Sequence, residues 1–268
     1  MSHSHFIDRP NGSRIAWRSH GQSLGPTILL SNSLAADWTM WDAVIAQLSA
    51  KYRVITYDNR GHGESSSPDQ LSSMADLSAD ALAVLDAAQA DKVWWVGISL
   101  GGMVGMQTAL DHPERLSGLM VSNSRARIDQ AGIEAWNMRV AKAREEGIAA
   151  ISQPTLERWF APDVVAAQPE TMAGVKAMIE RTTPVGFATC VEAIKTMALW
   201  DRLPGMQVPT CFVSGAQDGA APPTEMQAMA ERVTGSRAQV LDPCGHLSSI
   251  QRPDDLVALF IDWSESLG

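Results

Sequence analysis

A serine enclosed by glycines, between an apolar strand and a helix, constrains this chain more than any other feature. Residues 93–96 are β-branched or aromatic, which is typical of a buried strand. Residues 103–110 then place mostly apolar side chains at helical spacing. Between them lies Gly97-Ile98-Ser99-Leu100-Gly101, a G-x-S-x-G pattern. A strand, a tight turn and a helix hold such a serine strained and exposed, so we predict that Ser99 is a nucleophile.

The composition is that of a globular enzyme with a sizeable core. The 268 residues are 45% hydrophobic and 19% charged, which suits one large α/β domain or one with an insertion. The net charge of −9 argues against nucleic acid or an anionic membrane as the main partner. Cys190, Cys211 and Cys244 are far apart and odd in number, so no disulfide framework is expected. With no apolar leader or long apolar run, we expect a soluble, cytoplasmic protein.

Short apolar strands alternate with helices in both end regions of the chain. This alternation predicts an α/β fold, a mostly parallel sheet with helices on both faces. The predicted strands are 14–18, 26–30, 52–57, 92–96, 116–122, 210–214 and 238–241, and the predicted helices are 41–48, 76–90, 103–110, 224–233 and one from 254 onwards.

The middle of the chain has a different pattern. Residues 125–200 show helical periodicity interrupted by prolines, and no convincing strand. We predict that they form a helical cap inserted between two strands of a core made of 1–124 and 201–268. This segment has nine Lys or Arg and nine Asp or Glu, so the net charge of −9 belongs to the core. An anionic ligand would therefore meet least repulsion beneath the cap.

Two later loops supply the partners that a serine nucleophile requires. A hydroxyl reacts only when a base takes its proton and a third group orients that base. Such partners should follow later strands, where sites in open parallel sheets form. Asp218 follows the strand 210–214, and His246 lies in the loop after 238–241. The chain order Ser99, Asp218, His246 is the one expected with this type of serine turn, so we predict a catalytic triad.

Each partner has alternatives. Asp218 could be a turn carboxylate, and Asp242 is the rival acid, although it is too near His246 in the chain to fold back onto it. Asn123, at the end of another predicted strand, cannot act as the acid. Cys244 with His246 is too small a set for a metal site, so we expect no metal and no cofactor.

The intermediate of acyl transfer needs backbone donors aimed at its negative oxygen. One should be the N–H group of Leu100, the residue after the nucleophile. The other should come from the loop after the strand 26–30. We choose Leu34, with Ser33 as the alternative.

Several motifs resemble one family. They are Leu30–Leu34 followed by Met40-Trp41-Asp42, then Tyr57–Ser65, Gly97–Gly102, Gly245–Ser248, and in the predicted cap Glu134–Trp136 and Leu156–Phe160. Over almost its full length the chain resembles the α/β-hydrolase fold superfamily and, within it, the 3-oxoadipate enol-lactonases of bacterial aromatic-acid degradation. The Ser31–Leu34 loop and the cap motifs are the more diagnostic ones. Asn59 and Cys244-Gly245 depart from the usual pattern, and His62 is interpreted as a turn or packing residue.

The resemblance implies hydrolysis of 3-oxoadipate enol-lactone to 3-oxoadipate through an acyl-enzyme. The partner would then be a small lactone or ester that carries a carboxylate, and homo-oligomers are possible. A cation near the pocket is expected. Arg139, one helical turn from Trp136, is the candidate, with Arg158 beside Trp159 as the alternative. Both arginines could instead lie on solvated helix faces, and both tryptophans could simply pack the cap.

Other functions of the same fold compete with this one. An esterase or acyl-homoserine lactonase would use the same triad on neutral substrates, and a carbon–carbon bond hydrolase shares it as well. A non-catalytic receptor is a third class, which an intact triad disfavours. Epoxide hydrolases and dehalogenases of this fold use an aspartate nucleophile, so Ser99 excludes them.

Overall fold

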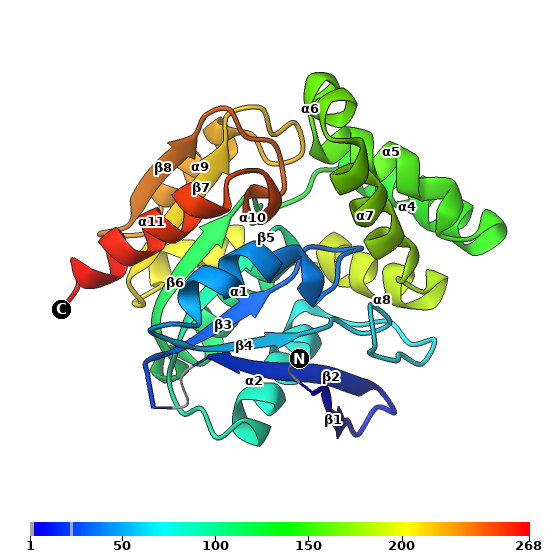
Figure 1. Ribbon diagram of the computed structural model, residues 1–268. Coiled ribbons are helices and arrows are strands. Elements are labelled where there is room, and N and C mark those ends of the chain that lie inside the picture. The colour runs from blue at the N-terminus through cyan, green and yellow to red at the C-terminus, as the bar shows by residue number, and fades with distance from the viewer. Residues whose placement is uncertain (1–2, 22–23) are drawn as a thin grey trace.

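A single twisted sheet organises the protein. The computed structural model describes residues 3–21 and 24–268. Within these ranges, eight strands form one sheet in the order β1-β2-β4-β3-β5-β6-β7-β8 (Figure 1). They are β1 (His5–Asp8), β2 (Arg14–Gly21), β3 (Thr27–Ser31), β4 (Arg53–Tyr57), β5 (Val93–Ile98), β6 (Leu116–Ser122), β7 (Thr210–Gly215) and β8 (Arg237–Leu241). The pairs β1–β2 and β2–β4 are antiparallel and the other pairs are parallel, so the predicted, mostly parallel α/β sheet is confirmed.

Strand β1 was not among the predicted strands. It has only four residues, three of them exposed, and therefore lacks the alternation of buried and exposed residues that identifies a half-buried strand. Its pairing depends on β2, because His5 stands opposite Trp17 and their rings stack with centroids 4.6 Å apart. An edge strand of this kind is specified by its neighbour.

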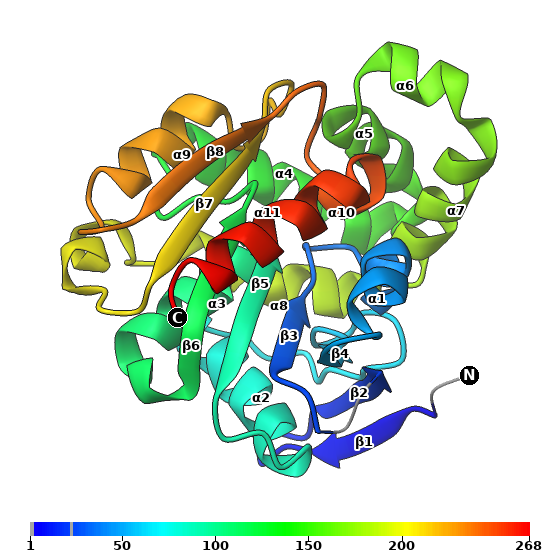
Figure 2. The ribbon, with the colours of Figure 1, turned by 60° about the vertical axis from the view of Figure 1, so that its left-hand side comes forward.

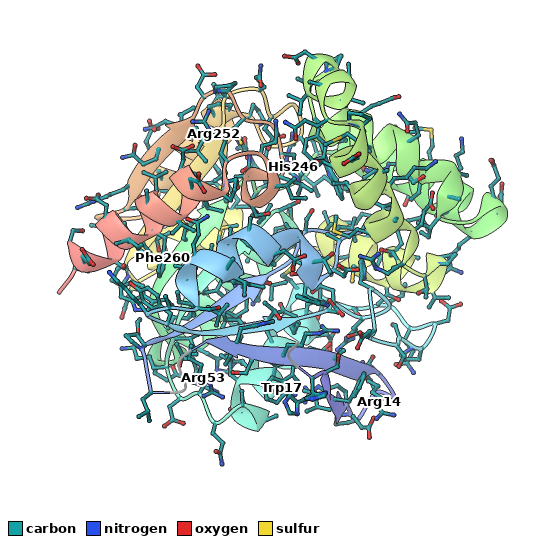
Figure 3. The ribbon with its side chains drawn as sticks, in the orientation of Figure 1. Arg14, Trp17, Arg53, His246, Arg252 and Phe260 are labelled. Carbon is teal, nitrogen blue, oxygen red and sulfur yellow. The ribbon has the colours of Figure 1, made fainter. Side chains whose placement is uncertain are left out.

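Helices cover both faces of the sheet (Figure 2). On one face α1 (Asp42–Leu48) packs against α11 (Pro253–Glu265), which carries the buried Phe260 labelled in Figure 3. On the other face lie α2 (Met74–Ala87) and α3 (Leu100–Asp111), while α9 (Pro223–Ala230) packs against β7 and β8. The short helices are η1 (Trp38–Trp41), η2 (Pro113–Arg115), η3 (Trp200–Gly205) and α10 (Ser248–Gln251).

Five α-helices lie between β6 and the short helix η3 in the chain, and we call them the helical insertion. They are α4 (Gln130–Glu146), α5 (Ala149–Trp159), α6 (Pro162–Ala167), α7 (Pro169–Glu180) and α8 (Pro184–Lys195). Three of them begin with a proline, where the missing N–H group is not needed. Figure 1 shows the insertion, in green and yellow-green, at one end of the sheet. The boundaries 125 and 200 of a separate cap remain a prediction.

Two further sequence expectations concern the cysteines and the membrane. All three cysteines are buried and free. Within the described residues, no helix combines the length and the apolar character that a membrane span requires.

Candidate active site

Ser99 occupies the turn between β5 and α3 in a strained conformation. Its φ of 56° and ψ of −115° lie in a region that residues with a side chain avoid. Such a conformation costs about 1–3 kcal/mol and persists only where its surroundings enforce it. Here the Ser99 N–H group donates to the Ser122 carbonyl at 2.9 Å, and the Ser124 hydroxyl donates to the Ser99 carbonyl at 2.7 Å. The last residue of β6 and the segment just after it thus hold the serine turn from the side.

The glycines of the motif are required by close packing. A Cβ atom on Gly97 would collide with the carbonyl oxygen of Gly101, and one on Gly101 would collide with the carbonyl of Ser31. The indole N–H of Trp95 also donates to the Gly101 carbonyl at 3.0 Å. Strand and helix can therefore approach as closely as the strained turn demands.

His246 lies in the loop between β8 and α10, beside the helical insertion (Figure 3). Its Nδ1 atom is 2.8 Å from Asp218 Oδ2, and both side chains are buried. An ionised carboxylate accepts only, so Nδ1 carries a hydrogen; in the neutral form of this ring the free lone pair is then on Nε2. The insertion holds the same loop, because the His246 N–H group donates to the Trp159 carbonyl at 2.8 Å and the two rings stack with centroids 6.2 Å apart.

Asp218 is held ionised by several donors. Its Oδ2 atom accepts from the Asn123 amide at 2.9 Å, and its Oδ1 atom accepts from the backbone N–H groups of Ala220 at 2.7 Å and Ala221 at 3.1 Å. Burial by itself would raise the pKa of Asp218. The charge of His246 and these hydrogen bonds outweigh burial, so the pKa lies below its usual value. A carboxylate of this kind can orient an imidazole and stabilise its charged form.

Asn123 is a site residue that sequence reasoning missed. It adopts a φ of 49°, which asparagine tolerates better than most residues. Its amide donates both to Asp218 Oδ2 and to the Gly245 carbonyl at 3.1 Å, so it ties the acid to the histidine loop. The available signal was its position at the end of β6, which we used only to reject it as the acid.

The loop after β3 leaves one N–H group free at the position where an oxyanion donor was predicted. The Ser33 N–H group points to Met40 Sδ at 3.5 Å, and the Ala35 N–H group donates to His62 Nε2 at 3.0 Å. Within the described part of the chain, the Leu34 N–H group between them has no acceptor, and neither has that of Leu100 at the start of α3. This pattern favours Leu34 over Ser33.

A cavity of about 110 Å³ joins these elements to the insertion. It is lined by Ser99 and His246 from the core and by Trp136, Arg139 and Trp159 from α4 and α5. Four of the described residues around it are arginines, and none is an aspartate or glutamate; the arginines are Arg125, Arg127, Arg139 and Arg158. The cavity therefore has a positive wall in a protein whose net charge is negative.

The four arginines differ in their partners. Arg125 donates to the Ala220 carbonyl, and Arg127 pairs with Glu225 at 3.1 Å. Arg139 donates to Thr155 Oγ1 at 2.8 Å and lies over the Trp136 ring, 4.5 Å from its centroid. Burial and the neighbouring charge of Arg158 lower the pKa of Arg139 to about 10, so it is still a cation at neutral pH.

Arg139 and Arg158 share one further property. Across residues 3–21 and 24–268, neither guanidinium has a carboxylate within 4 Å. Arg139 is only half-exposed, and a charge in that position is stabilised by an opposite one. The cavity can therefore accept an anion.

The described residues contain no group of three or more His, Cys, Asp or Glu side chains that could hold a metal ion. Burial raises the pKa of the Cys244 thiol to about 12, so this neighbour of His246 is not a thiolate at neutral pH.

Comparison with known proteins agrees with this architecture. Residues 26–253 match the model of the alpha/beta hydrolase fold. The chain belongs to the α/β-hydrolase family. It is 33% identical to 3-oxoadipate enol-lactonase 2 of Acinetobacter baylyi over 251 residues, 93% of each chain. The crystal structure of the enol-lactonase from Burkholderia xenovorans LB400 matches with a TM-score of 0.92 at 33% identity, covering 97% of this chain and 99% of that one.

The likeness extends to esterases. A thermophilic esterase from Thermogutta terrifontis, with malate bound, matches with a TM-score of 0.90 at 27% identity, over 99% of this chain and 98% of that one. These relatives and the hydrolase fold identify the chain as an enzyme that hydrolyses esters or lactones and resembles the enol-lactonases.

Proposed function

We propose that this α/β-hydrolase opens the lactone ring of 3-oxoadipate enol-lactone to give 3-oxoadipate, a reaction of bacterial aromatic-acid degradation in the cytoplasm. The observation that carries the proposal is Arg139, a half-buried cation without a carboxylate partner among the described residues, in the same cavity as Ser99 and His246. A neutral ester offers such a group only an uncharged oxygen acceptor. A lactone that carries a carboxylate would offer a charge-assisted hydrogen bond.

The first half of the reaction uses the three side chains predicted as a triad. His246, oriented by Asp218 through Nδ1, takes the proton of the Ser99 hydroxyl with Nε2. Ser99 Oγ then forms a bond to the lactone carbonyl carbon. The N–H groups of Leu34 and Leu100 stabilise the resulting oxyanion, a role consistent with their lack of another acceptor within the described residues.

The second half releases the product. The oxyanion collapses, and the bond between the carbonyl carbon and the ring oxygen breaks. The leaving enolate takes the proton from His246. Tautomerisation of the enol to a ketone removes the tethered nucleophile, so the ring cannot close again. Water, deprotonated by His246, then attacks the ester carbonyl of the acyl-enzyme, and Ser99 leaves with its proton restored.

The helical insertion would hold the distal end of the substrate. We assign the substrate carboxylate to Arg139, with Arg158 as the alternative. Trp136 lies beneath the Arg139 guanidinium and Thr155 accepts one of its N–H groups, so the cation is already oriented. A fixed orientation lowers the entropy lost when the anion binds.

The test is a comparison of kcat/KM on four substrates: the enol-lactone, neutral γ-butyrolactone, an acyl-homoserine lactone and a short nitrophenyl ester. We expect the enol-lactone to be preferred by more than tenfold, which corresponds to about 1.4 kcal/mol of transition-state binding. A smaller preference would replace this proposal with a general carboxylesterase, which the esterase relative also favours. Ser99→Ala is the control for contaminating hydrolases and should lose on the order of 10⁴–10⁶ in turnover.

A further inference from the structure

A buried histidine outside the predicted triad lies directly behind the loop that carries Leu34. His62 is fully buried, and its Nε2 atom accepts a hydrogen bond from the Ala35 N–H group at 3.0 Å. Its Nδ1 atom lies 2.8 Å from the Arg60 carbonyl oxygen. A carbonyl accepts only and a backbone N–H donates only, so Nδ1 carries the hydrogen and Nε2 does not. These two contacts select one neutral tautomer.

The residue that His62 holds has a strained backbone. Ala35 adopts a φ of 59°, a left-handed conformation that alanine avoids. Its neighbour Leu34 carries the N–H group that lacks an acceptor within the described residues. The strain must be maintained by contacts, and the bond to His62 Nε2 is the one made by the Ala35 N–H group itself.

The helical insertion supports the same arrangement from behind. The Gly61 carbonyl, one residue before His62, accepts from the Thr183 N–H group at 2.7 Å and from its hydroxyl at 3.1 Å. A Cβ atom on Gly61 would collide with the backbone of Gly186 at the start of α8. Helix α8 therefore fixes the His62 backbone, and His62 in turn fixes Ala35.

We propose that His62 is a positioning residue for the oxyanion site: as the neutral Nδ1–H tautomer, it holds the Leu34–Ala35 turn so that the Leu34 N–H group faces the reacting carbonyl. This inference rests on the proposed serine mechanism. The oxyanion exists only along the reaction path, so loss of the turn lowers kcat and leaves KM nearly unchanged. A histidine that merely filled space would not separate the two constants.

The test compares His62→Leu, which removes the acceptor, with His62→Gln, whose side-chain oxygen can reach the position of Nε2. We expect His62→Leu to lower kcat by about 10–100-fold, because removal of a whole oxyanion donor costs about 100–1000-fold, with KM within about twofold. Affinity for a boronic acid that forms a tetrahedral adduct with Ser99 should fall by a similar factor. His62→Gln should recover most of both losses.

His20→Leu is the matched control, since it removes a half-buried imidazole whose ring nitrogen contacts Thr56 Oγ1, away from the cavity. It should retain wild-type kcat. Wild-type kcat in folded His62→Leu, or equal losses in the Leu and Gln variants, would overturn the inference.

Ring ¹⁵N shifts of His62 in the wild-type enzyme provide a readout that needs neither folded variants nor substrate. The Nδ1–H tautomer is expected at pH 7, and an Nε2–H tautomer or an imidazolium would overturn the inference. Failure of the inference about His62 can be distinguished from failure of the serine mechanism. If Ser99→Ala remained active, the mechanism would be wrong whatever the state of His62.

Discussion

The two walls of the cavity satisfy their polar groups in opposite ways. The core wall includes His246 and Asn123, and behind it Asp218 accepts hydrogen bonds from both of these side chains and from two backbone N–H groups. On the insertion wall, Arg139 and Arg158 have no carboxylate partner in the described chain, although one of them is half-buried. In the proposed mechanism the core groups act in every turnover, and they are already organised by hydrogen bonds before the substrate arrives. The unpaired charge of the arginines is what the proposed anionic substrate would complete.

The walls meet at Trp159. Its carbonyl accepts from the His246 N–H group, and its ring stacks on the imidazole. Trp159 is the last residue of α5, where helix carbonyls lack partners of their own, so the histidine loop completes the end of this helix. The insertion cannot move at this point without breaking a buried hydrogen bond to the proposed base. Each wall should therefore be tested separately by side-chain replacement, because deletion of the insertion would also remove the support of His246.

Asp218→Asn should have the largest effect, and it tests the core wall. An amide at this position can donate to the imidazole and stabilises the wrong tautomer, so kcat should fall by about 10⁴. Steady-state kinetics on the enol-lactone would measure the loss. Asp242→Asn, at the exposed rival acid, is the control and should stay within about twofold of wild type. A loss of less than tenfold in Asp218→Asn, or an equal loss in Asp242→Asn, would contradict the triad.

The next effect concerns acid stability and tests His62, which lies behind the core wall. Burial lowers the pKa of His62 to about 4 from 6.5, although the Arg60 carbonyl and the charge of Asp37 act the other way. The folded protein thus excludes a proton that the unfolded chain binds, so stability falls as the pH drops from 6.5 towards 4. Between pH 7 and pH 5 the loss from this group should be about 2 kcal/mol.

Protonation of a nearby carboxyl changes stability in the opposite direction. The stability loss of the wild type must therefore be compared with that of a variant that lacks the imidazole. Burial raises the pKa of Asp58 to about 6, which favours the folded state as the pH falls. Urea unfolding of wild type and His62→Gln at pH 7 and pH 5 cancels that contribution. The wild type should lose about 2 kcal/mol more than the variant. Equal losses would show that the His62 imidazole does not exclude a proton.

The sequence predicted the parts of the site that follow from topology. The serine turn has a local motif, and Asp218 and His246 could be placed because each follows a strand of a parallel sheet. Carboxyl ends of parallel strands meet at one edge, so three residues far apart in the chain could be assigned together. Strand β1 escaped prediction because its residues are mostly exposed and its pairing is supplied by β2.

The contacts that hold the site could not be predicted in this way. Asn123 reaches Asp218 across 95 residues and His62 reaches Ala35 across 27, and both bonds depend on side-chain directions that no periodicity encodes. Helical spacing gave Arg139 and Trp136 one common face of a helix. Helical spacing does not show whether that face meets solvent or the cavity. The packing of α4 against α5 and α8 decides this.

Arg139→Ala should have the smallest effect, and it tests the insertion wall. Removing the cation should raise KM for the carboxylated lactone about tenfold, since one partly exposed charge-assisted hydrogen bond is lost, and leave kcat within about twofold. Hydrolysis of a neutral nitrophenyl ester should not change. Arg144→Ala is the matched control, because Arg144 lies on the same helix but pairs with Asp69 on the surface.

The remaining outcomes of this experiment separate the two candidate arginines and the two walls. A rise in KM for Arg158→Ala but not for Arg139→Ala would transfer the carboxylate to Arg158. Unchanged KM in both variants would contradict an anionic substrate. A fall in kcat on the neutral ester would have another meaning, because that ester does not need the cation. It would show that α4 and α5 act on His246 through Trp159, so that a change on the insertion wall also alters the core wall.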